Sequence, residues 1–262
     1  KCIPCVIGKA PQAPYLSPMS RPMDLLALVH VDIMGPFPVP SPRHGIYLFD
    51  MVDGLSTWVR VTELRQKNGS FRAFTQTQAL WEKSTGRKIL AVRLDGAKEF
   101  VEGKLGDFLR DSGIRIQLTA PYAHAQAGFV ERRNRMLQDG GQALNADAGG
   151  PPSMIFDAIL CHAYVRNRLP SSVLPAGATP YSLMNNGTPP DLAHLRPFGC
   201  RCYPFVPHEL RKKGGPRRFA AIFVGYEEDR VGWKVRDKAG KYWFSRDVIF
   251  NELESGFTSD IP

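Results

Sequence analysis

The chain has 262 residues, 43% of them hydrophobic, and a formal net charge of +9. This length and apolar share predict a folded protein of one or two domains and exclude a disordered chain. The excess of Lys and Arg favours a polyanionic partner such as nucleic acid, because neutralised phosphates release their counterions. Basic charge alone is also a common solubility feature.

No apolar run approaches the roughly 18 residues of a membrane span, and no secretory signal pattern is present, so we expect a soluble, intracellular protein with no membrane partner.

A Cys-x-x-Cys pair, Cys2 and Cys5, stands at the start of the chain. Two thiolates supply half of a tetrahedral zinc site, and no His or Cys pair nearby supplies the other half. Five cysteines are an odd number and too thinly spread for a disulfide framework, which favours a reducing compartment. The other three are expected to be small buried residues: Cys161, Cys200 and Cys202.

The next part of the chain alternates between patterns typical of strands and helices. A proline-rich linker at residues 10–27 precedes it. The expected elements are, in chain order, strands at 28–31, 46–52 and 57–61, a helix at 70–84, a strand at 89–94, a helix near 103–112, a strand at 114–118, and helices at 128–147 and 153–169. This order predicts an α/β fold, a mixed sheet with helices packed on its faces.

After Pro189 and Pro190 the composition changes to short strands at near-regular spacing, which is typical of a small barrel. These strands are expected at 201–205, 219–225, 232–236 and 241–245. A basic loop lies between the first two of them and comprises Arg211, Lys212, Lys213, Arg217 and Arg218. Contact with phosphate and a plain solvated loop explain this cluster equally well.

Three acidic residues are placed so that their side chains would meet. Asp32 and Asp95 each follow a predicted buried strand, and Glu131 lies in a helical segment with 35 residues (131 − 95 − 1) between it and Asp95. Clustered carboxylates bind hard divalent cations, and two such ions support phosphoryl transfer on nucleic acid. Each residue taken alone fits an exposed surface position better, by roughly three to one, because Asp and Glu are mostly exposed.

The sequence around these residues resembles the integrase of copia-type (Pseudoviridae) LTR retrotransposons. The blocks that carry the resemblance are residues 30–36 (HVDIMGP), 47–56 (YLFDMVDGLS), 93–100 (RLDGAKEF) and 128–134 (GFVERRN). Later blocks follow in the family's order: residues 164–170 (YVRNRLP), 178–181 (ATPY), 195–200 (LRPFGC), 222–226 (IFVGY) and 245–250 (SRDVIF). The resemblance therefore covers nearly the whole chain.

The resemblance implies that Asp32, Asp95 and Glu131 are the D,D(35)E ligands of two Mg²⁺ or Mn²⁺ ions. It implies an RNase H-like mixed five-stranded sheet flanked by helices, followed by a small SH3-like β-barrel. The implied organisation is a zinc-knuckle remnant at 1–9, a linker at 10–27, a catalytic core at 28–185, a linker at 186–195 and the SH3-like domain at 196–255. Cys2 and Cys5 would bind Zn²⁺ only together with two histidines upstream of the chain. Because the chain begins without Met, we expect it to be a piece of a longer polyprotein.

The implied activity is trimming of the 3′ ends of element cDNA, followed by transfer of those ends into host DNA. The implied partners are double-stranded DNA and further copies of the chain, in the nucleus and in cytoplasmic virus-like particles. Besides the basic loop, the residues expected to contact DNA are His124, Gln126, Arg132, Asn134 and Arg135. On the residues alone, an i,i+4 ion pair between Glu131 and Arg135 and a solvated turn around His124 are the alternatives.

Two stretches depart from the family pattern. The usual R-S-D-N-G-x-E-F reads RLDGAKEF at residues 93–100, and the usual P-Q-x-N-G reads HAQAG at 124–128. An Asn side chain bonds nearby backbone in turns, so Ala127 removes an anchor from the loop expected before Glu131. These departures keep open a copy that binds DNA without cutting it. A third function also stays open, because the same carboxylate fold could support an RNase H-type hydrolase of RNA–DNA hybrids.

Overall fold

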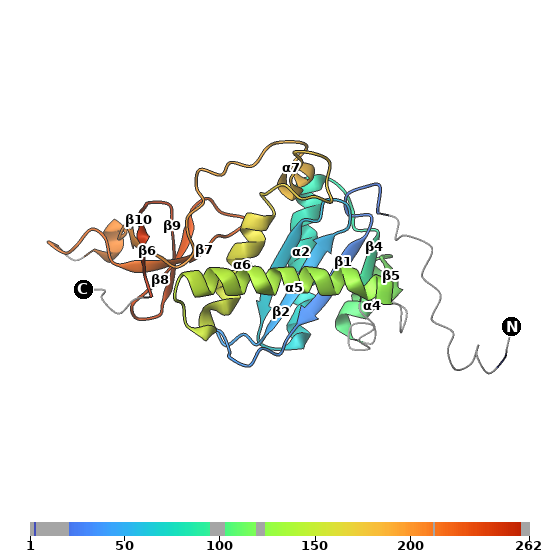
Figure 1. The fold of residues 1–262 in the computed structure, drawn as a ribbon, viewed down its shortest axis with the longest axis horizontal. Coiled ribbons are helices and arrows are strands. Elements are labelled where there is room, and N and C mark those ends of the chain that lie inside the picture. Colours follow the sequence, from blue (N-terminus) through green and yellow to red (C-terminus); the bar gives the residue numbers. More distant parts are fainter. Residues whose placement is uncertain (1–2, 4–20, 95–102, 119–123, 212, 258–262) are drawn as a thin grey trace.

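The structure is a computed structural model that describes residue 3 and residues 21–94, 103–118, 124–211 and 213–257. Cys2, Cys5, Asp95, Lys212 and most of the predicted linker lie outside these residues. Two five-stranded sheets form the molecule and lie one after the other along its long axis (Figure 1). No described helix is both long and apolar enough to cross a lipid bilayer.

The first sheet is mixed and has the strand order β3-β2-β1-β4-β5. Its strands are β1 (Val29–Met34), β2 (Tyr47–Asp53), β3 (Val59–Leu64), β4 (Ala91–Leu94) and β5 (Arg115–Leu118). β1, β2 and β3 pair antiparallel because short connections join them, whereas β4 and β5 run parallel to β1 after helical crossovers. The predicted α/β fold class is confirmed.

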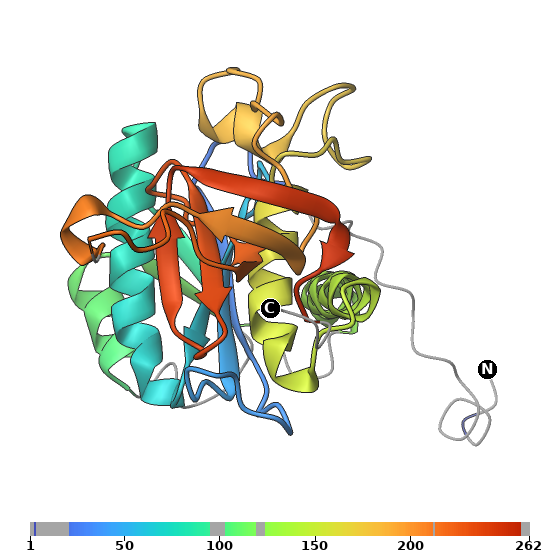
Figure 2. The same cartoon turned by 90° about the vertical axis from the view of Figure 1, so that its left-hand side faces the viewer.

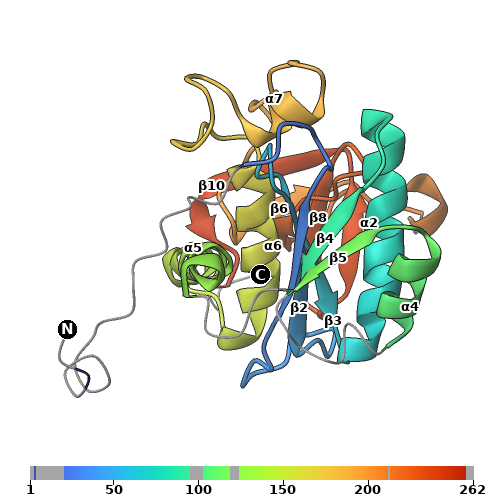
Figure 3. The same cartoon turned by 90° about the vertical axis from the view of Figure 1, so that its right-hand side faces the viewer.

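Helices cover both faces of this sheet (Figure 3). One face carries α2 (Ser70–Thr85) and α4 (Lys104–Asp111), and the other carries α5 (His124–Asp147) and α6 (Ile155–Arg166). A short helix, α7 (Pro180–Met184), and three 3₁₀ turns, η1 (Lys67–Gly69), η2 (Pro152–Met154) and η3 (His208–Leu210), complete the helical elements described.

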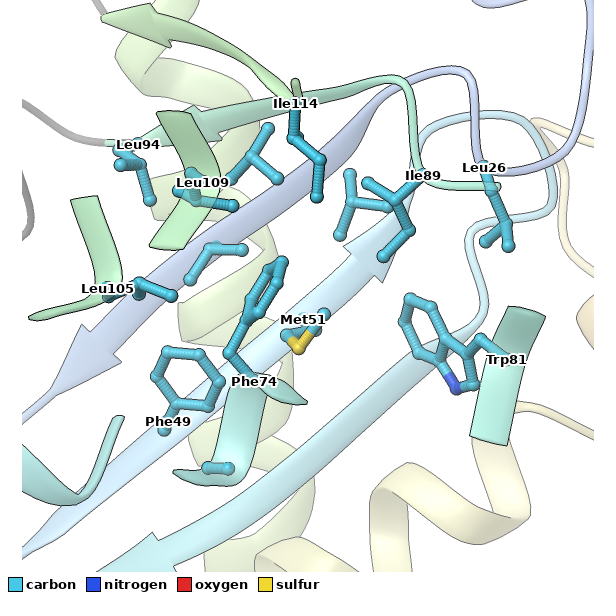
Figure 4. Close-up of a cluster of buried hydrophobic side chains, with 14 of the residues drawn as sticks. Leu26, Phe49, Met51, Phe74, Trp81, Ile89, Leu94, Leu105, Leu109 and Ile114 are labelled. Carbon is cyan, nitrogen blue, oxygen red and sulfur yellow. The ribbon is translucent and has the colours of Figure 1, made fainter. Parts of the chain in front are cut away.

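The two faces of β2 enter different cores, because side chains alternate along a strand. Phe49 and Met51 pack in the cluster beneath α2 and α4, together with Phe74 (Figure 4). Leu48 and Val52 pack in the second cluster, beneath α5 and α6. Asp50, which lies between Leu48 and Val52 on the α5 face, is therefore a carboxylate in an apolar layer.

Glycines let α5 pack closely against α6. A Cβ atom on Gly141 would lie 2.3 Å from Ile159 Cγ1 and 3.0 Å from the Ile159 Cα atom. Neighbouring Gly140 likewise faces the His162 ring, at 2.3 Å from Cε1. The position of α5 over the sheet is thus set partly by its close contact with α6.

The second sheet is antiparallel, with the order β10-β6-β7-β8-β9, and faces the viewer in Figure 2. Its strands are β6 (Cys200–Pro204), β7 (Ala221–Gly225), β8 (Trp233–Asp237), β9 (Tyr242–Ser245) and β10 (Val248–Ser255). Phe223 and Val235 are fully buried in its core, as is Cys202. Cys161 and Cys200 are also buried, as predicted.

The structure corrects the sequence analysis at three elements. α5 begins at His124, so residues 124–127 are helical and do not form the expected loop; Ala125 and Ala127 favour a helix intrinsically. α7 and β10 were not predicted. β10 exposes Ile249 and Leu253 to solvent and, among the residues that the structure describes, pairs with β6 alone. Its sequence therefore lacks the clear apolar alternation of a strand with one buried face.

A fully buried carboxylate joins the two sheets. Asp157 on α6 accepts a hydrogen bond from Lys234 Nζ on β8 at 2.9 Å and another from the Tyr242 hydroxyl on β9 at 2.6 Å. Arg43, in the loop between β1 and β2, reaches the same carboxylate at 2.9 Å. Because a buried charge is costly unless it is paired, these contacts fix the second sheet against α6.

Two further contacts hold the sheets together at a different point. Arg60 on β3 forms an ion pair with Glu228 in the loop between β7 and β8. The indole nitrogen of Trp233 donates to the His194 carbonyl at 2.9 Å. The second sheet is therefore tied to the first through three of its strands or their connecting loops.

Asn167, just after α6, acts as a pairing partner for β3. Its side-chain oxygen accepts from the Val59 amide at 2.9 Å, and its side-chain nitrogen donates to the Val59 carbonyl at 2.7 Å. Val59 pairs with Val52 of β2 on its other side. The end of α6 is thus fixed to the outer strand of the first sheet.

Replacing Asp157 by Asn should weaken the junction between the sheets. The substitution keeps the volume but leaves Lys234 and Arg43 without their shared counter-charge, so we expect a loss of about 3 kcal/mol in the free energy of unfolding. Urea denaturation measures this loss, and limited proteolysis should show faster cleavage between the two sheets. Asp139→Asn, at an exposed position of α5, is the control. Equal stability of the two variants would contradict the assigned role of Asp157.

Candidate active site

Asp32 lies on β1, directly opposite Asp50 of β2 in the antiparallel register. Directly paired residues point to the same face, and like charges at such positions repel. Asp32 is half-buried, whereas Asp50 is fully buried. The face that α5 covers therefore presents two neighbouring carboxylates.

Two consecutive residues of α5 meet these two carboxylates. Arg133 forms an ion pair with Asp50, with Nη2 and Oδ2 2.5 Å apart, and the side chains are 6% and 0% exposed. Asn134 donates from its side-chain nitrogen to Asp32 Oδ2 at 2.6 Å. The helix is thus held to the sheet at the point where Asp32 stands.

Glu131 is exposed on α5, three residues before Asn134. Residues three apart on a helix share a face, so Glu131 lies one turn from the residue that contacts Asp32. The third predicted carboxylate, Asp95, lies outside the described residues. β4, which precedes it in the sequence, ends at Leu94, the parallel partner of Val31.

The other residues predicted near the site differ in how the structure places them. Arg132 and Arg135 are exposed on α5, and Glu131 and Arg135 form no ion pair within the described part of the chain. His124 and Gln126 lie in the first turn of α5, and their side chains are outside the description. Asn134, predicted to contact DNA, donates a hydrogen bond to Asp32 in this structure.

The basic loop of the second sheet is partly engaged in its own structure. Arg211 and Arg218 both lie over the Phe205 ring, at 4.7 and 5.7 Å from its centroid, and Arg218 also pairs with Asp247 at 2.7 Å. Lys213 and Arg217 are exposed. These two are the loop cations best placed to meet a phosphate.

Burial and neighbouring charges on the α5 face shift the pKa values of two residues, Asp50 and His30. Burial raises the pKa of Asp50 to about 7; Arg133 opposes the shift and the charge of Asp32 adds to it. Burial, together with the positive charges of Arg133 and Arg93, lowers the pKa of His30 to about 3. His30 therefore remains neutral in the folded protein at ordinary pH.

Sequence reasoning missed Asp50, Arg133 and His30. A signal for Asp50 was present: the predicted hairpin partner of the first strand carries an aspartate among apolar residues. Its position opposite Asp32 depends on the strand register, which the pattern alone does not fix.

Comparison with known proteins identifies the chain's relatives. It is 30% identical over 261 residues to the retrovirus-related Pol polyprotein from transposon TNT 1-94 of Nicotiana tabacum, covering 99% of this chain and 20% of the relative. It is 26% identical over 252 residues to the corresponding polyprotein from transposon RE2 of Arabidopsis thaliana, covering 96% of this chain and 17% of the relative. Residues 200–261 match the family model of the retroviral polymerase SH3-like domain.

The chain is similar to the retrovirus-related Pol polyproteins of these plant transposons over nearly all of its own length. It spans about a fifth of the TNT 1-94 polyprotein. Its fold is similar to that of a chain in the cryoEM structure of the simian T-cell lymphotropic virus intasome bound to PP2A regulatory subunit B56 gamma. That likeness has a TM-score of 0.51 and 17% identity, and covers 87% of this chain and 78% of the other. It bears on the fold alone.

The oxygen donors near Asn134 suit a hard divalent ion. Asp32 and Glu131 offer carboxylates, the ligands that Mg²⁺ and Mn²⁺ prefer. Within the described residues no group of three or more His, Cys, Asp or Glu side chains is placed to hold a metal, and Asp95 lies outside them. The site is also separate from a cavity of about 490 Å³ between the two sheets, which is lined by aromatic residues such as Trp58, Tyr164 and Trp233.

Buried His30 should make the protein less stable in acid. The folded protein keeps His30 neutral down to about pH 3, whereas the unfolded chain takes up a proton near pH 6.5, so stability falls as the pH drops through this window. Between pH 7 and pH 5 the loss should be about 2 kcal/mol from this residue. Urea denaturation at both pH values should show a smaller difference for His30→Gln than for the wild type.

Two features make this comparison specific. Asp50 acts in the opposite direction over part of the same range, because its raised pKa favours the folded state at lower pH. The test therefore compares the pH dependence of stability in each variant with that of the wild type, and does not rest on the wild-type pH dependence alone. His208→Gln, at an exposed position, is the control; if both variants change the pH dependence equally, the assignment to His30 is wrong.

Proposed function

We propose that the chain is the integrase region of a retrotransposon polyprotein, with Asp32, Asp95 and Glu131 as its catalytic carboxylates. The observation that supports this most directly is the contact of Asn134 with Asp32, which brings the Glu131 turn of α5 close to Asp32 on β1. Relatedness to the Pol polyproteins over nearly the whole chain supports the same proposal.

The proposed reaction has two steps at one site. Water first cleaves a phosphodiester near each 3′ end of the element DNA. The 3′-hydroxyl that results then attacks a phosphodiester of the target: a new P–O bond forms to the attacking oxygen, the bond to the leaving 3′-oxygen breaks, and the proton of the hydroxyl passes to solvent. Bound Mg²⁺ or Mn²⁺ would activate the attacking oxygen and stabilise charge on the phosphate.

The side chains of the protein have distinct parts in this proposal. Asp32 and Glu131, with Asp95, would hold the two metal ions, and Asn134 would orient the Asp32 carboxylate. Arg132 and Arg135 project from α5 beside Glu131 and would bind the phosphates of the DNA near the scissile bond. His124 and Gln126 in the first turn of the same helix are proposed to contact the DNA ends.

The second sheet would extend the DNA surface. Lys213 and Arg217 are exposed there, and the Asp157 junction holds this sheet in a fixed position against α6. We include Arg211, Lys212 and Arg218 in the proposed DNA-binding loop, and propose that several copies of the chain act together on the two DNA ends.

The predicted organisation is also part of the proposal. It places the core at 28–185 and the SH3-like domain at 196–255, with linkers at 10–27 and 186–195. Residues 1–9 would end a zinc knuckle in which Cys2 and Cys5 bind Zn²⁺ with upstream histidines. Activity is proposed to occur in the nucleus, after assembly in cytoplasmic particles.

Removing one metal-binding carboxylate should abolish catalysis and spare DNA binding. We expect Asp95→Asn and Asp32→Asn to lower Mg²⁺- or Mn²⁺-dependent strand transfer by about 100-fold or more, because charge stabilisation at the reacting phosphate is lost. The assay joins a labelled terminal-repeat oligonucleotide to plasmid DNA, using the chain with its upstream flank, and a gel-shift titration measures binding. Asp139→Asn on α5 is the matched control.

Each other outcome of this assay has a definite meaning. Normal nicking by Asp95→Asn would remove the catalytic assignment. Tight DNA binding without products from the wild type would favour a copy that binds without cutting. Faster cleavage of an RNA–DNA hybrid than of duplex DNA would favour the RNase H-type hydrolase.

The exposed cations of the second sheet should contribute measurably to DNA affinity. Each phosphate contact contributes about 0.9 to the slope of log affinity against log salt concentration, so the double variant Lys213→Ala/Arg217→Ala should lower this slope by about 1.8. Fluorescence anisotropy at several salt concentrations measures it. Arg72→Ala/Lys83→Ala, at exposed positions of α2, is the matched control. An unchanged slope in the first variant would exclude these two phosphate contacts.

A further inference from the structure

A cavity of about 490 Å³ lies where the outer strand of the first sheet meets the loop between β7 and β8. Its described walls come from β3 and the turn before it, the end of α2, α6, α7, the segment after α7 and that loop. This volume is typical of ligand pockets. The described lining residues include none from α5 or β1, so the cavity is separate from the candidate active site.

The walls of this cavity are largely aromatic and apolar. Tyr164, Tyr181 and Trp233 are half-buried and line it. Two further lining residues are apolar and open to solvent: Leu80 is 38% exposed and Val231 is 81% exposed. Apolar groups beside a cavity gain free energy when a partner removes them from water. The surface therefore favours a ligand that carries an apolar side chain and extends beyond the cavity itself.

Two of the three arginines on the described wall are paired with neighbouring carboxylates. Arg60 forms an ion pair with Glu228, and Arg230 forms one with Glu227. The Arg230 guanidinium also lies over the Phe244 ring, 4.5 Å from its centroid. An anionic ligand would have to displace a carboxylate to reach either guanidinium.

The third arginine, Arg168, is enclosed by the wall. It is 7% exposed and donates from Nη1 to the Tyr164 carbonyl at 2.9 Å. Its guanidinium carbon lies 3.4 Å from the centroid of the Tyr164 ring and 5.1 Å from that of Tyr181. Aromatic rings attract a cation placed over their faces, so this charge is already held within the fold. The described wall thus offers an anion no free cation.

Two carboxylates of the same wall are free to meet a cation. Asp191 and Asp229 are exposed and form no ion pair within the described part of the chain. Asp191 accepts a hydrogen bond from the Ala193 amide through Oδ1, at 2.9 Å. In a chain with a net charge of +9, two unpaired carboxylates beside an aromatic cavity favour a cationic ligand and disfavour a phosphate backbone.

We propose that this cavity binds a basic peptide segment of a protein partner. An apolar side chain of the peptide lies between the aromatic walls, and its Lys or Arg side chains meet Asp191 and Asp229. A peptide, unlike a small cation, also covers Leu80 and Val231. The cavity uses no residue of the proposed DNA surface, so this inference goes beyond the proposed function and does not depend on it.

Fluorescence anisotropy with three fluorescein-labelled pools of six-residue peptides tests this inference on the whole 262-residue chain. Each peptide of the first pool has one Leu or Phe between Lys and Arg residues. The second pool has Glu in place of Lys and Arg, and the third has Gly in place of the apolar residue. We expect the first pool to bind about tenfold more tightly than either of the others, because each of those lacks one half of the match.

The other outcomes of this comparison overturn the inference. Equal binding of the first and third pools would mean that charge alone attracts the peptides, without use of the cavity. Tighter binding of the second pool would mean that the cavity prefers an anion. Absence of binding by the first pool would mean that the cavity is not a site for basic peptides.

Variants of the two carboxylates locate the binding. Asp191→Asn/Asp229→Asn keeps an acceptor for the Ala193 amide but removes both charges, so the first pool should bind about fivefold more weakly. Asp191→Lys/Asp229→Lys should bind the second pool more tightly than the first, which a purely structural role would not produce. Asp111→Asn/Asp139→Asn, at exposed positions elsewhere, is the matched control and should stay within about twofold of the wild type. Equal effects of the two Asn variants would overturn the inference.

A variant at the apolar side of the cavity gives an independent test. Ser84 is exposed at the end of α2 and lines the cavity. Ser84→Arg places a long cationic side chain there and should weaken binding of the first pool about tenfold, whereas Gln76→Arg, at an exposed position of the same helix, should not. If the Asn variant of the carboxylates does not fold, this pair still decides, and equal binding by the two Arg variants overturns the inference.

A gel-shift titration with duplex DNA separates peptide binding from simple repulsion of nucleic acid. We expect Asp191→Asn/Asp229→Asn to bind DNA within about threefold of the wild type, because the proposed DNA surface is unchanged. If this variant binds peptides as the wild type does and binds DNA much more tightly, the two carboxylates serve to repel DNA and the inference is wrong.

Discussion

The burial of three carboxylates is the constraint on which this structure depends. Asp50, Asp53 and Asp157 are all fully buried, and an ionised carboxylate removed from water is destabilising unless it is paired or hydrogen-bonded. Each finds at least one partner in a distant segment. Asp53 accepts from the Leu26 amide before β1 and from Ser56 after β2; Asp50 pairs with α5; and Asp157 joins α6 to the second sheet. Satisfying these groups therefore fixes the chain entry to β1, the position of α5 and the docking of the second sheet.

The same constraint couples the candidate site to the stability of the core. The segment of α5 that neutralises Asp50 also carries Asn134, which contacts Asp32, and the exposed Glu131. Arg133 and Asn134 are adjacent in the sequence, so a small rotation of the helix would disturb both contacts together. The catalytic geometry proposed for this chain thus depends on a buried ion pair within the protein as much as on the acidic residues themselves.

Much of the fold could be predicted from local sequence, and the reasons for the exceptions are physical. Apolar runs bounded by Pro and Gly identified the strands of the first sheet, whereas the acidic triad remains a prediction from the resemblance to the copia-type family. The start of α5 was misplaced because the family pattern suggested a turn where Ala125 and Ala127 favour a helix. β10 was not predicted because Ile249 and Leu253 are apolar but exposed, so the strand lacks the apolar alternation that a buried face would produce. The Asp50–Arg133 pair could not be predicted, since it depends on the register of two strands and the rotation of one helix.

The contact between Asn167 and Val59 has a consequence for self-association. β3 is an outer strand of the first sheet, and the unpaired amide and carbonyl groups of such a strand are a template to which another chain can add by backbone pairing. The Asn167 side chain occupies both groups of Val59 and places the end of α6 over that stretch of the edge. A side-chain amide that imitates a peptide unit thus blocks the addition of another strand at this point of the β3 edge.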